Sequence, residues 1–151
     1  MKSLKLYEDR PAYGLLLRFI VIVVPGSLLA TSFFVWRSGN QTDALWLLGE
    51  VAFISLLFWA IFPRSYQVYE DHLRIRLGGP FLVKVGFDNI KSVGIARGLN
   101  FGINFATAIT KNGVEIVRKR GARINITPRA PEQFVENAER AWKQWQMAQG
   151  R

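Results

Sequence analysis

Apolar positions form two long runs in the first part of the chain. The first run, residues 19–36, contains no charged residue over eighteen positions. The second run, residues 44–62, is nineteen residues long and is interrupted only by Glu50. About 20 consecutive apolar residues are enough to cross the hydrocarbon core of a bilayer. The pattern therefore predicts two transmembrane helices, at about 14–36 and 44–62, within an N-terminal unit of residues 1–63.

Two other interpretations compete with this one. Buried core helices would produce the same apolar runs, but residues 64–151 alone would then have to enclose both of them. A cleaved signal peptide would explain the first run, but that run is longer than the apolar region of a typical signal peptide. Its segment Leu28-Leu29-Ala30 is also a poor cleavage site. We therefore expect the first run to remain in the mature protein.

Lysine and arginine are unevenly distributed around this predicted hairpin. The connecting segment, residues 37–43, holds one arginine and no lysine. Basic residues accumulate on the other side of both helices, at Lys2, Lys5, Arg10, Arg18, Arg64, Arg74 and Arg76. Loops rich in lysine and arginine stay in the cytoplasm. We expect a multi-pass protein of the cytoplasmic (inner) membrane with both termini in the cytoplasm.

From residue 64 onward the pattern changes to short alternating segments bounded by turn residues. Leu73, Ile75 and Leu77 alternate with polar positions, as in a half-buried strand. We predict six or seven short strands, with candidate segments at 66–69, 72–77, 81–87, 90–93, 101–110, 114–119 and 124–126. The turn sequence Asn112-Gly113 predicts that the segments before and after it pair as a hairpin.

A C-terminal amphipathic helix follows the last predicted strand. Pro131 suits a first helical position, where its missing N–H would have no partner anyway. Apolar residues then recur at spacings of three and four, at Phe134, Ala138, Ala141, Trp142 and Trp145. We predict a helix of about four turns. The fold class expected for residues 64–151 is α+β: a bent antiparallel sheet or partly open barrel capped by this helix.

Four segments of this domain follow one another in a recognisable order. They are the extended pair 66–77, the turn Gly79-Pro80-Phe81, the segment 88–93 and the junction 127–134. In this order they resemble the bacterial pleckstrin-homology (PH) domain family. The resemblance implies a PH-like fold, which in this family often follows a two-helix membrane hairpin. Thr127 and Ala130 stand where serine and aspartate are usual, and without a side-chain oxygen at Ala130 the helix start loses about 1 kcal/mol.

The sequence carries no recognisable catalytic, cofactor-binding or metal-binding motif. It lacks nucleophile-elbow, phosphate-loop and zinc-protease motifs, and it has no cysteine for disulfides or zinc sites. His72 is interpreted as a solvated turn residue rather than a general base. Glu70 and Asp71 are adjacent, so on a strand they point to opposite faces and cannot act as a pair. We expect a non-catalytic protein with no cofactor and no bound metal.

Glu50 is the one charged residue within the apolar runs. A charge at the centre of a membrane helix costs about 2.5–3.5 kcal/mol on insertion scales, so such residues usually face a partner or stay protonated. In an antiparallel hairpin turning at 37–43, Glu50 would lie level with about position 30. A protonated Glu50 would then bond the hydroxyls of Thr31 and Ser32, or of Ser27 one turn deeper. Contact with another membrane protein is the alternative, and a proton path is disfavoured because no second buried acid continues it.

The predicted domain is strongly basic. Residues 64–151 hold 15 lysines and arginines against 7 acidic residues. Two groups stand out: Arg118, Lys119, Arg120 and Arg123 around one turn, and Arg74 and Arg76 on the outward face of one strand. Clustered cations bind phosphates in general, but a domain joined directly to a bilayer already lies against anionic lipid. We predict that these six residues bind anionic lipid headgroups or a protein partner, and we expect no nucleic acid.

Together these features predict a membrane-anchored, non-catalytic adaptor or assembly factor. Its hairpin would lie in the lipid bilayer, and its PH-like domain would hold a protein partner, anionic lipid or both at the cytoplasmic face. The alternative is a structural or regulatory subunit of a larger membrane protein complex, with Glu50 and the helix faces as the contact.

Overall fold

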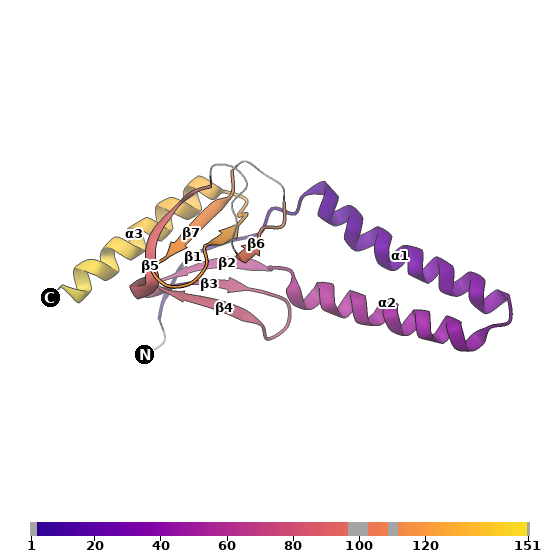
Figure 1. Cartoon of the computed structure of the whole chain (residues 1–151). Coiled ribbons are helices and arrows are strands. Elements are labelled where there is room, and N and C mark those ends of the chain that lie inside the picture. The colour runs from indigo at the N-terminus through magenta and orange to yellow at the C-terminus, as the bar shows by residue number, and fades with distance from the viewer. Residues whose placement is uncertain (1–2, 97–102, 109–111, 151) are drawn as a thin grey trace.

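The protein consists of a helical hairpin that projects from one end of a domain built from two sheets and one helix (Figure 1). The computed structural model describes residues 3–96, 103–108 and 112–150. In the hairpin, α1 (Leu15–Arg37) and α2 (Gln41–Ile61) run antiparallel. The turn between them uses Gly39, whose φ of 91° suits glycine. Asn40 caps α2 by accepting a hydrogen bond from the Asp43 backbone N–H at 3.3 Å.

Both hairpin helices expose their apolar side chains. Each is long and apolar enough, by length and composition, to cross a membrane. Within its most apolar 18-residue window, only 6% of each helix is buried inside the chain. The interpretation of these runs as buried core helices is therefore wrong. The two predicted apolar helices are confirmed, with ends one to three residues from the expected ones.

The first sheet is a four-stranded antiparallel meander in the order β1-β2-β3-β4. Its strands are β1 (Lys5–Asp9), β2 (Ser65–Tyr69), β3 (His72–Arg76) and β4 (Leu82–Gly86). The sequence predicted the last three but not β1. Only Tyr7 of β1 packs on the core while its neighbours are more exposed, so the strand lacks a strong alternating apolar signal. The N-terminal segment thus belongs to the sheet domain although α1 and α2 separate it from β2.

The second sheet has the order β5-β7-β8-β6. It follows a short 3-10 turn, η1 (Phe87–Asn89). Its strands are β5 (Ile90–Ile95), β6 (Ile103–Phe105), β7 (Val114–Arg118) and β8 (Ile124–Ile126). β7 lies between β5 and β8 and pairs antiparallel with both, whereas β6 pairs parallel with β8.

The predicted hairpin around Asn112-Gly113 is therefore wrong. Residues 109–111, on which part of that prediction falls, and 101–102, where its first strand was to begin, lie outside the described residues. The segment after β6 is held by β8 instead, because the Thr107 backbone N–H donates to the Thr127 hydroxyl at 2.9 Å. The Gly113 carbonyl accepts a hydrogen bond from the Ala96 N–H at 2.8 Å, which directs β7 to β5.

The C-terminal helix, α3 (Pro131–Gln149), covers the core shared by both sheets. Pro131 stands at its start, and Ala130 provides no side-chain cap, as the sequence predicts. The predicted stripe is confirmed: Phe134, Ala138 and Ala141 are buried, and Trp142 and Trp145 pack against the same core. At 19 residues the helix is about one turn longer than expected.

Tyr66 connects the two sheets through the core. Its ring is fully buried and meets Phe134 edge-on, with ring centroids 6.4 Å apart. Its hydroxyl donates to the carbonyl of Phe105 in β6 at 2.8 Å. Burial raises the pKa of Tyr66 to about 12, so the hydroxyl keeps its proton and remains a donor.

The ends of α1 and α2 that adjoin the domain, which form the two feet of the hairpin, are both hydrogen-bonded to the domain. At the α1 foot, the Ala12 N–H donates to the Thr127 carbonyl at 2.8 Å, and the Gly14 N–H donates to the Thr107 carbonyl at 2.9 Å. At the α2 foot, the Arg64 N–H donates to the Arg76 carbonyl at 2.6 Å. Each helix is thus tied to a different sheet, with no free linker at either foot.

Candidate functional site

The turn that follows β7 presents the predicted basic cluster on a fixed backbone. The side-chain amide of Asn89, in η1, forms two hydrogen bonds with the backbone of Arg120. It accepts one from the Arg120 N–H at 2.9 Å and donates one to the Arg120 carbonyl at 3.2 Å. The Lys119 N–H also donates to the Asn89 carbonyl at 2.7 Å. Gly121, with a φ of 94°, lets the chain reverse. The structure therefore brings Arg118, Lys119, Arg120 and Arg123 together, as predicted.

The charges of this cluster are only partly neutralised. The Arg123 guanidinium forms an ion pair with Glu115 at 3.1 Å. Arg118 donates to the Ala122 carbonyl at 2.7 Å and Lys119 to the Asp88 carbonyl at 2.8 Å, both of which are uncharged acceptors. Within the described part of the chain, Arg118, Lys119 and Arg120 have no carboxylate partner. The turn can therefore offer three positive charges to an anionic ligand or surface.

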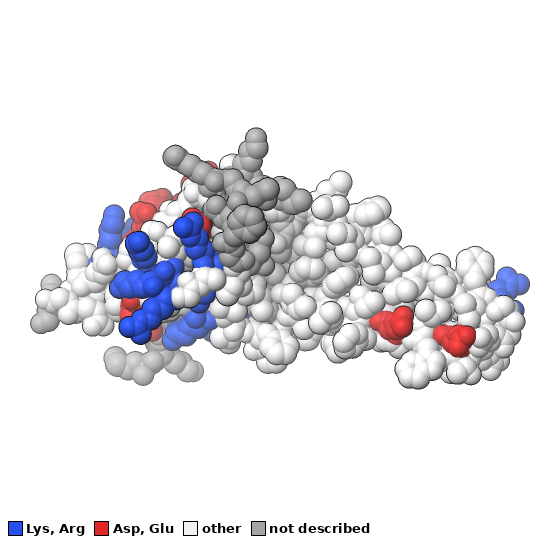
Figure 2. Space-filling view, viewed as in Figure 1, with Lys and Arg blue, Asp and Glu red and all other residues white. Residues whose placement is uncertain are grey.

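The cluster lies at the end of the domain that faces away from the hairpin. β3 starts at His72 and ends at Arg76, next to the α2 foot. Its first residue therefore lies at the end of the domain farther from the hairpin. β4 runs back alongside it and leads into η1, to which the basic turn is bound. Figure 2 shows lysine and arginine gathered on this distal end. A strand of five residues spans about 16 Å, which separates the cluster from the hairpin by at least that length.

Arg74 and Arg76, the other two predicted site residues, lie on β3 and not in the turn that follows β7. The Arg74 guanidinium lies over the ring of Tyr69, 5.9 Å from its centroid, and donates to its hydroxyl at 3.3 Å. Arg76 is exposed beside the α2 foot. Arg76 thus lies at the hairpin end of the domain, whereas the Arg74 guanidinium reaches Tyr69, the last residue of β2, at the end away from the hairpin.

His72 is buried, contrary to its interpretation as a solvated turn residue. Its side chain stacks on Tyr69, with ring centroids 4.5 Å apart and planes at 4°, and only 6% of the residue is exposed. Its Nδ1 lies 2.6 Å from a carboxylate oxygen of Asp71. Burial works to raise the pKa of Asp71, but the hydrogen bond from His72 and the nearby charges outweigh it and the pKa is lowered. Among the described residues, no group of three or more histidine, cysteine or acidic side chains could hold a metal ion.

Among the described residues, Glu50 forms no hydrogen bond with Thr31, Ser32 or Ser27, the three residues whose hydroxyl groups are predicted to bind it, and Ser27 donates to the Val24 carbonyl of its own helix at 2.9 Å. Thr31 donates to the Ser27 carbonyl of its own helix at 2.9 Å, whereas Ser32 donates across the hairpin to the Ala44 carbonyl at 2.9 Å. Because Ser32 lies level with Ala44, Glu50, six residues further along α2, lies level with Gly26 rather than with position 30. The carboxylate is exposed on the hairpin surface, where Figure 2 shows acidic side chains.

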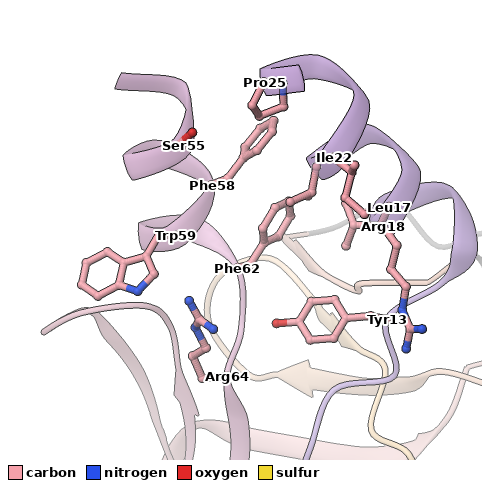
Figure 3. A pocket seen from close by; sticks show the side chains of 11 residues that line it. Tyr13, Leu17, Arg18, Ile22, Pro25, Ser55, Phe58, Trp59, Phe62 and Arg64 are labelled. Carbon is pink, nitrogen blue, oxygen red and sulfur yellow. The ribbon is translucent and has the colours of Figure 1, made fainter. Parts of the chain in front are cut away.

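A cavity of about 410 Å³ lies where the hairpin meets the domain (Figure 3). Apolar side chains of α1 and α2 form most of its wall, and Arg18 and Arg64 also line it, with their guanidinium groups on opposite sides of the Tyr13 ring (Figure 3). Tyr13 crosses its domain end and donates its hydroxyl to the Pro63 carbonyl, joining the two feet. Burial raises the pKa of Tyr13, and the positive charge of Arg64 partly opposes this rise.

Sequence reasoning missed this cavity. Its residues come from two segments about 40 positions apart, and their periodicity contains no sign of a shared cavity. The one available signal was a pair of arginines: Arg18 precedes the first apolar run and Arg64 follows the second, so both lie at the same end of the predicted hairpin.

Comparison with known proteins gives the chain a family but no close relative. No curated protein and no solved structure matches it. A family model described as a bacterial PH domain matches residues 64–140, about half of the chain, from the α2 foot to the middle of α3. This match confirms the resemblance drawn from the segments at 66–77, 79–81, 88–93 and 127–134. The chain therefore belongs to the bacterial PH domain family.

Proposed function

We propose that this protein is a membrane-anchored, non-catalytic adaptor or assembly factor that holds a protein partner at the cytoplasmic face of the inner membrane. A bacterial PH domain suggests a binding role. The fastened feet of the hairpin support the anchoring role, since they hold the domain at a fixed height and orientation above the bilayer.

Exposed apolar side chains support the membrane position of the hairpin. Phe19, Trp46 and Phe53 are 62%, 73% and 66% exposed, and a water-soluble surface would rarely carry so many. The turn between β3 and β4 extends this apolar surface: Phe81 and Leu82 are 55% and 47% exposed. That turn packs closely against Trp59 of α2: a Cβ atom added at Gly78 would lie only 1.5 Å from the Trp59 carbonyl oxygen. An interfacial position for this end of the domain agrees with its aromatic residues.

The observation that carries the proposal is the position of the basic cluster, Arg118, Lys119, Arg120 and Arg123. At about 16 Å or more from the hairpin, it lies two Debye lengths from the bilayer at physiological salt, where attraction to anionic lipid is largely screened. An acidic surface on a protein partner can reach it directly, and interfaces pair opposite potentials in this way. Of the two predicted ligands, the arrangement favours the protein partner over lipid headgroups of the anchoring membrane.

A photo-crosslinking amino acid at Ala122, an exposed position in the basic turn, tests this proposal in intact cells. We expect one discrete protein adduct, identified by mass spectrometry, and none from the same group at Gln144 on the exposed face of α3. The variant Lys119→Glu/Arg120→Glu should reduce the adduct about tenfold or more, since each reversal costs about 1 kcal/mol or more at a charged interface.

The matched control is Arg129→Glu/Lys143→Glu, which makes the same charge change at exposed positions just before α3 and on α3. It should leave the adduct unchanged. Equal loss in both variants would mean that net charge rather than this cluster matters. An adduct with lipid alone would assign the cluster to a membrane surface.

A second candidate function is that of a structural or regulatory subunit of a larger membrane protein complex. The exposed position of Glu50 on the hairpin favours it, because a carboxylate facing lipid is costly and another transmembrane helix would provide a partner. Mild detergent extraction followed by size analysis separates the two candidates. A subunit should elute with stoichiometric companions, whereas an adaptor should elute largely alone.

A further inference from the structure

The turn between β3 and β4 packs through its backbone on the last turn of α2 (Figure 1). Gly78 and Gly79 make this close approach possible. A Cβ atom at Gly79 would lie 2.8 Å from the Trp59 ring, and the φ of Gly79, 61°, also suits glycine. The Leu77 N–H donates to the Phe81 carbonyl at 3.0 Å and closes the turn. The turn therefore has a fixed place beside the end of α2.

Three consecutive apolar residues of this turn and the start of β4 are exposed. Pro80 is exposed, and Phe81 and Leu82 are 55% and 47% exposed. Apolar residues scattered singly over a surface are normal, whereas a contiguous apolar patch marks a contact surface. Trp59, on which the turn packs, is itself 48% exposed. The exposed apolar surface of α2 thus continues onto the sheet domain.

The level of the turn along α2 indicates what covers this surface. Trp59 lies two residues before the end of α2, about 3 Å along the helix axis. α2 is long and apolar enough to cross a membrane. In the proposed membrane position of the hairpin, its last turn lies where acyl chains meet headgroups, the level at which tryptophan is enriched. A turn held at this level meets lipid.

An unpaired arginine lies beside the apolar residues. Arg76, the last residue of β3, stands directly opposite Leu82 in the register of β3 with β4, so the two side chains share one face of the sheet. Arg76 is exposed and forms no ion pair with the described residues. Its apolar stem can lie along Leu82 while its guanidinium reaches phosphates. This combination suits the lipid interface, which is apolar on one side and charged on the other.

We propose that the β3–β4 turn is a second membrane contact, which inserts Phe81 and Leu82 among the upper acyl chains of the leaflet facing the domain. Arg76 lies among the headgroups of the same leaflet. The inference rests on the proposed membrane position of the hairpin. The hairpin anchors the domain, and the turn fixes its tilt, because tilting this side away would return two large apolar side chains to water. This tilt holds the basic cluster at 118–123 away from the bilayer, open to a protein partner.

Site-specific fluorescence of the full chain in phosphatidylglycerol–phosphatidylcholine vesicles tests the inference. The sequence has no cysteine, so Phe81→Cys carries a single environment-sensitive nitrobenzoxadiazole label. We expect blue-shifted emission that is quenched by phosphatidylcholine with a nitroxide near the top of its acyl chain. Ala122→Cys, in the distal basic turn, is also exposed and should show neither effect. Phe53→Cys, near the middle of α2, should be quenched most by a nitroxide near the end of the acyl chain.

A label at Lys84→Cys reports the height of β4 while Phe81 and Leu82 stay in place. Its quenching should be weaker than at Phe81, since three strand residues span about 10 Å. In the Phe81→Ser/Leu82→Ser background it should fall about twofold or more, because the burial that held this side of the domain in lipid is lost. Leu4→Ser/Leu6→Ser is the matched control. It removes two exposed leucines near the distal end and should leave the Lys84 signal unchanged.

The labels separate failure of the inference from failure of the anchoring. An unquenched label at Phe53 would contradict the proposed anchoring itself. With Phe53 quenched, a Phe81 label that behaves like the Ala122 label would overturn the inference and leave the anchoring standing. A blue-shifted Phe81 label that no lipid nitroxide quenches would mean that protein covers the turn, which also overturns it. An unchanged Lys84 signal in Phe81→Ser/Leu82→Ser, or an equal loss in Leu4→Ser/Leu6→Ser, would contradict the inferred control of tilt.

Discussion

A carboxylate oxygen of Asp9 accepts a hydrogen bond from the backbone N–H of Ala130 at 2.8 Å, across 121 positions of sequence. Ala130 precedes the first residue of α3 and has no side-chain cap of its own. In a capping box, a Glu or Gln three residues into the helix binds this N–H, and Gln133 occupies that position here. The Ala130 N–H donates to Asp9 instead. β1 thus supplies the acceptor from outside the helix, and it places a negative charge where the helix dipole favours one.

Asp9→Ala should therefore weaken the whole domain. Loss of a partly buried, charge-assisted hydrogen bond at a helix start costs about 1–2 kcal/mol of unfolding free energy. Urea unfolding of the full chain in detergent, followed by tryptophan fluorescence, to which Trp142 and Trp145 of α3 contribute, measures the change. Asp9→Asn keeps an acceptor and should lose clearly less. A wild-type midpoint in Asp9→Ala would show that this contact does not stabilise α3.

This contact also illustrates what the sequence could and could not predict. The hairpin helices and α3 were predictable because their signals are local: long apolar runs, Pro131 and a stripe at helical spacing. β1 was not, since Tyr7 is its single core contact, reaching Phe134 at 6.3 Å between ring centroids. Its pairing with β2 bridges the entire hairpin, and no local pattern contains that information.

Long-range contacts explain the other differences in the same way. Contacts between Thr107 and Thr127 accompany the parallel pairing of β6 with β8, and two polar residues far apart in the sequence give no sign of such contacts. The basic cluster at 118–123 was recognised because its members are neighbours in sequence. The cavity at the hairpin foot was missed because its lining residues come from two segments that are distant in the sequence and come together only in the fold.

Glu8 should make the attachment of β1 dependent on acid pH. Hydrogen bonds from Lys5 at 2.6 Å and from Gln67 at 2.9 Å lower the pKa of Glu8 from 4.5 to about 2. Because the folded pKa is the lower one, these contacts stabilise the fold above about pH 4.5. Their contribution is lost progressively as the pH falls toward about 2.

The comparison of wild type with Glu8→Gln measures this dependence. The urea midpoint of the wild type should exceed that of Glu8→Gln at neutral pH, and the two should converge between about pH 4.5 and pH 2. The difference will be small because Glu8 is partly solvated. A difference that is constant across this range would assign the effect to packing rather than to ionisation.

Both termini should lie in the cytoplasm, as the lysine and arginine asymmetry predicts. The chain has no native cysteine, so a single introduced thiol reports one position. In intact cells with a permeable outer envelope, cysteine at Ser38 in the hairpin turn should react with a membrane-impermeant maleimide. Cysteine at Gln149, near the end of α3, should react only after lysis. The reverse pattern of labelling would contradict this topology and the proposed cytoplasmic partner.

Glu50→Gln distinguishes the two candidate functions. The substitution keeps the size of the side chain and can replace a protonated acid, but it cannot carry a charge. An adaptor that uses the distal basic cluster does not need this charge, so Glu50→Gln should insert normally and keep its crosslink at Ala122. A subunit that pairs an ionised Glu50 with a cation of a neighbouring helix should lose its companions in detergent size analysis.

Asp43→Asn serves as the matched control, because Asp43 lies in the first turn of α2, at the water-facing end of the hairpin, and carries the same charge. Loss of companions in Glu50→Gln alone, with insertion unchanged, would favour the membrane complex and contradict the adaptor proposal.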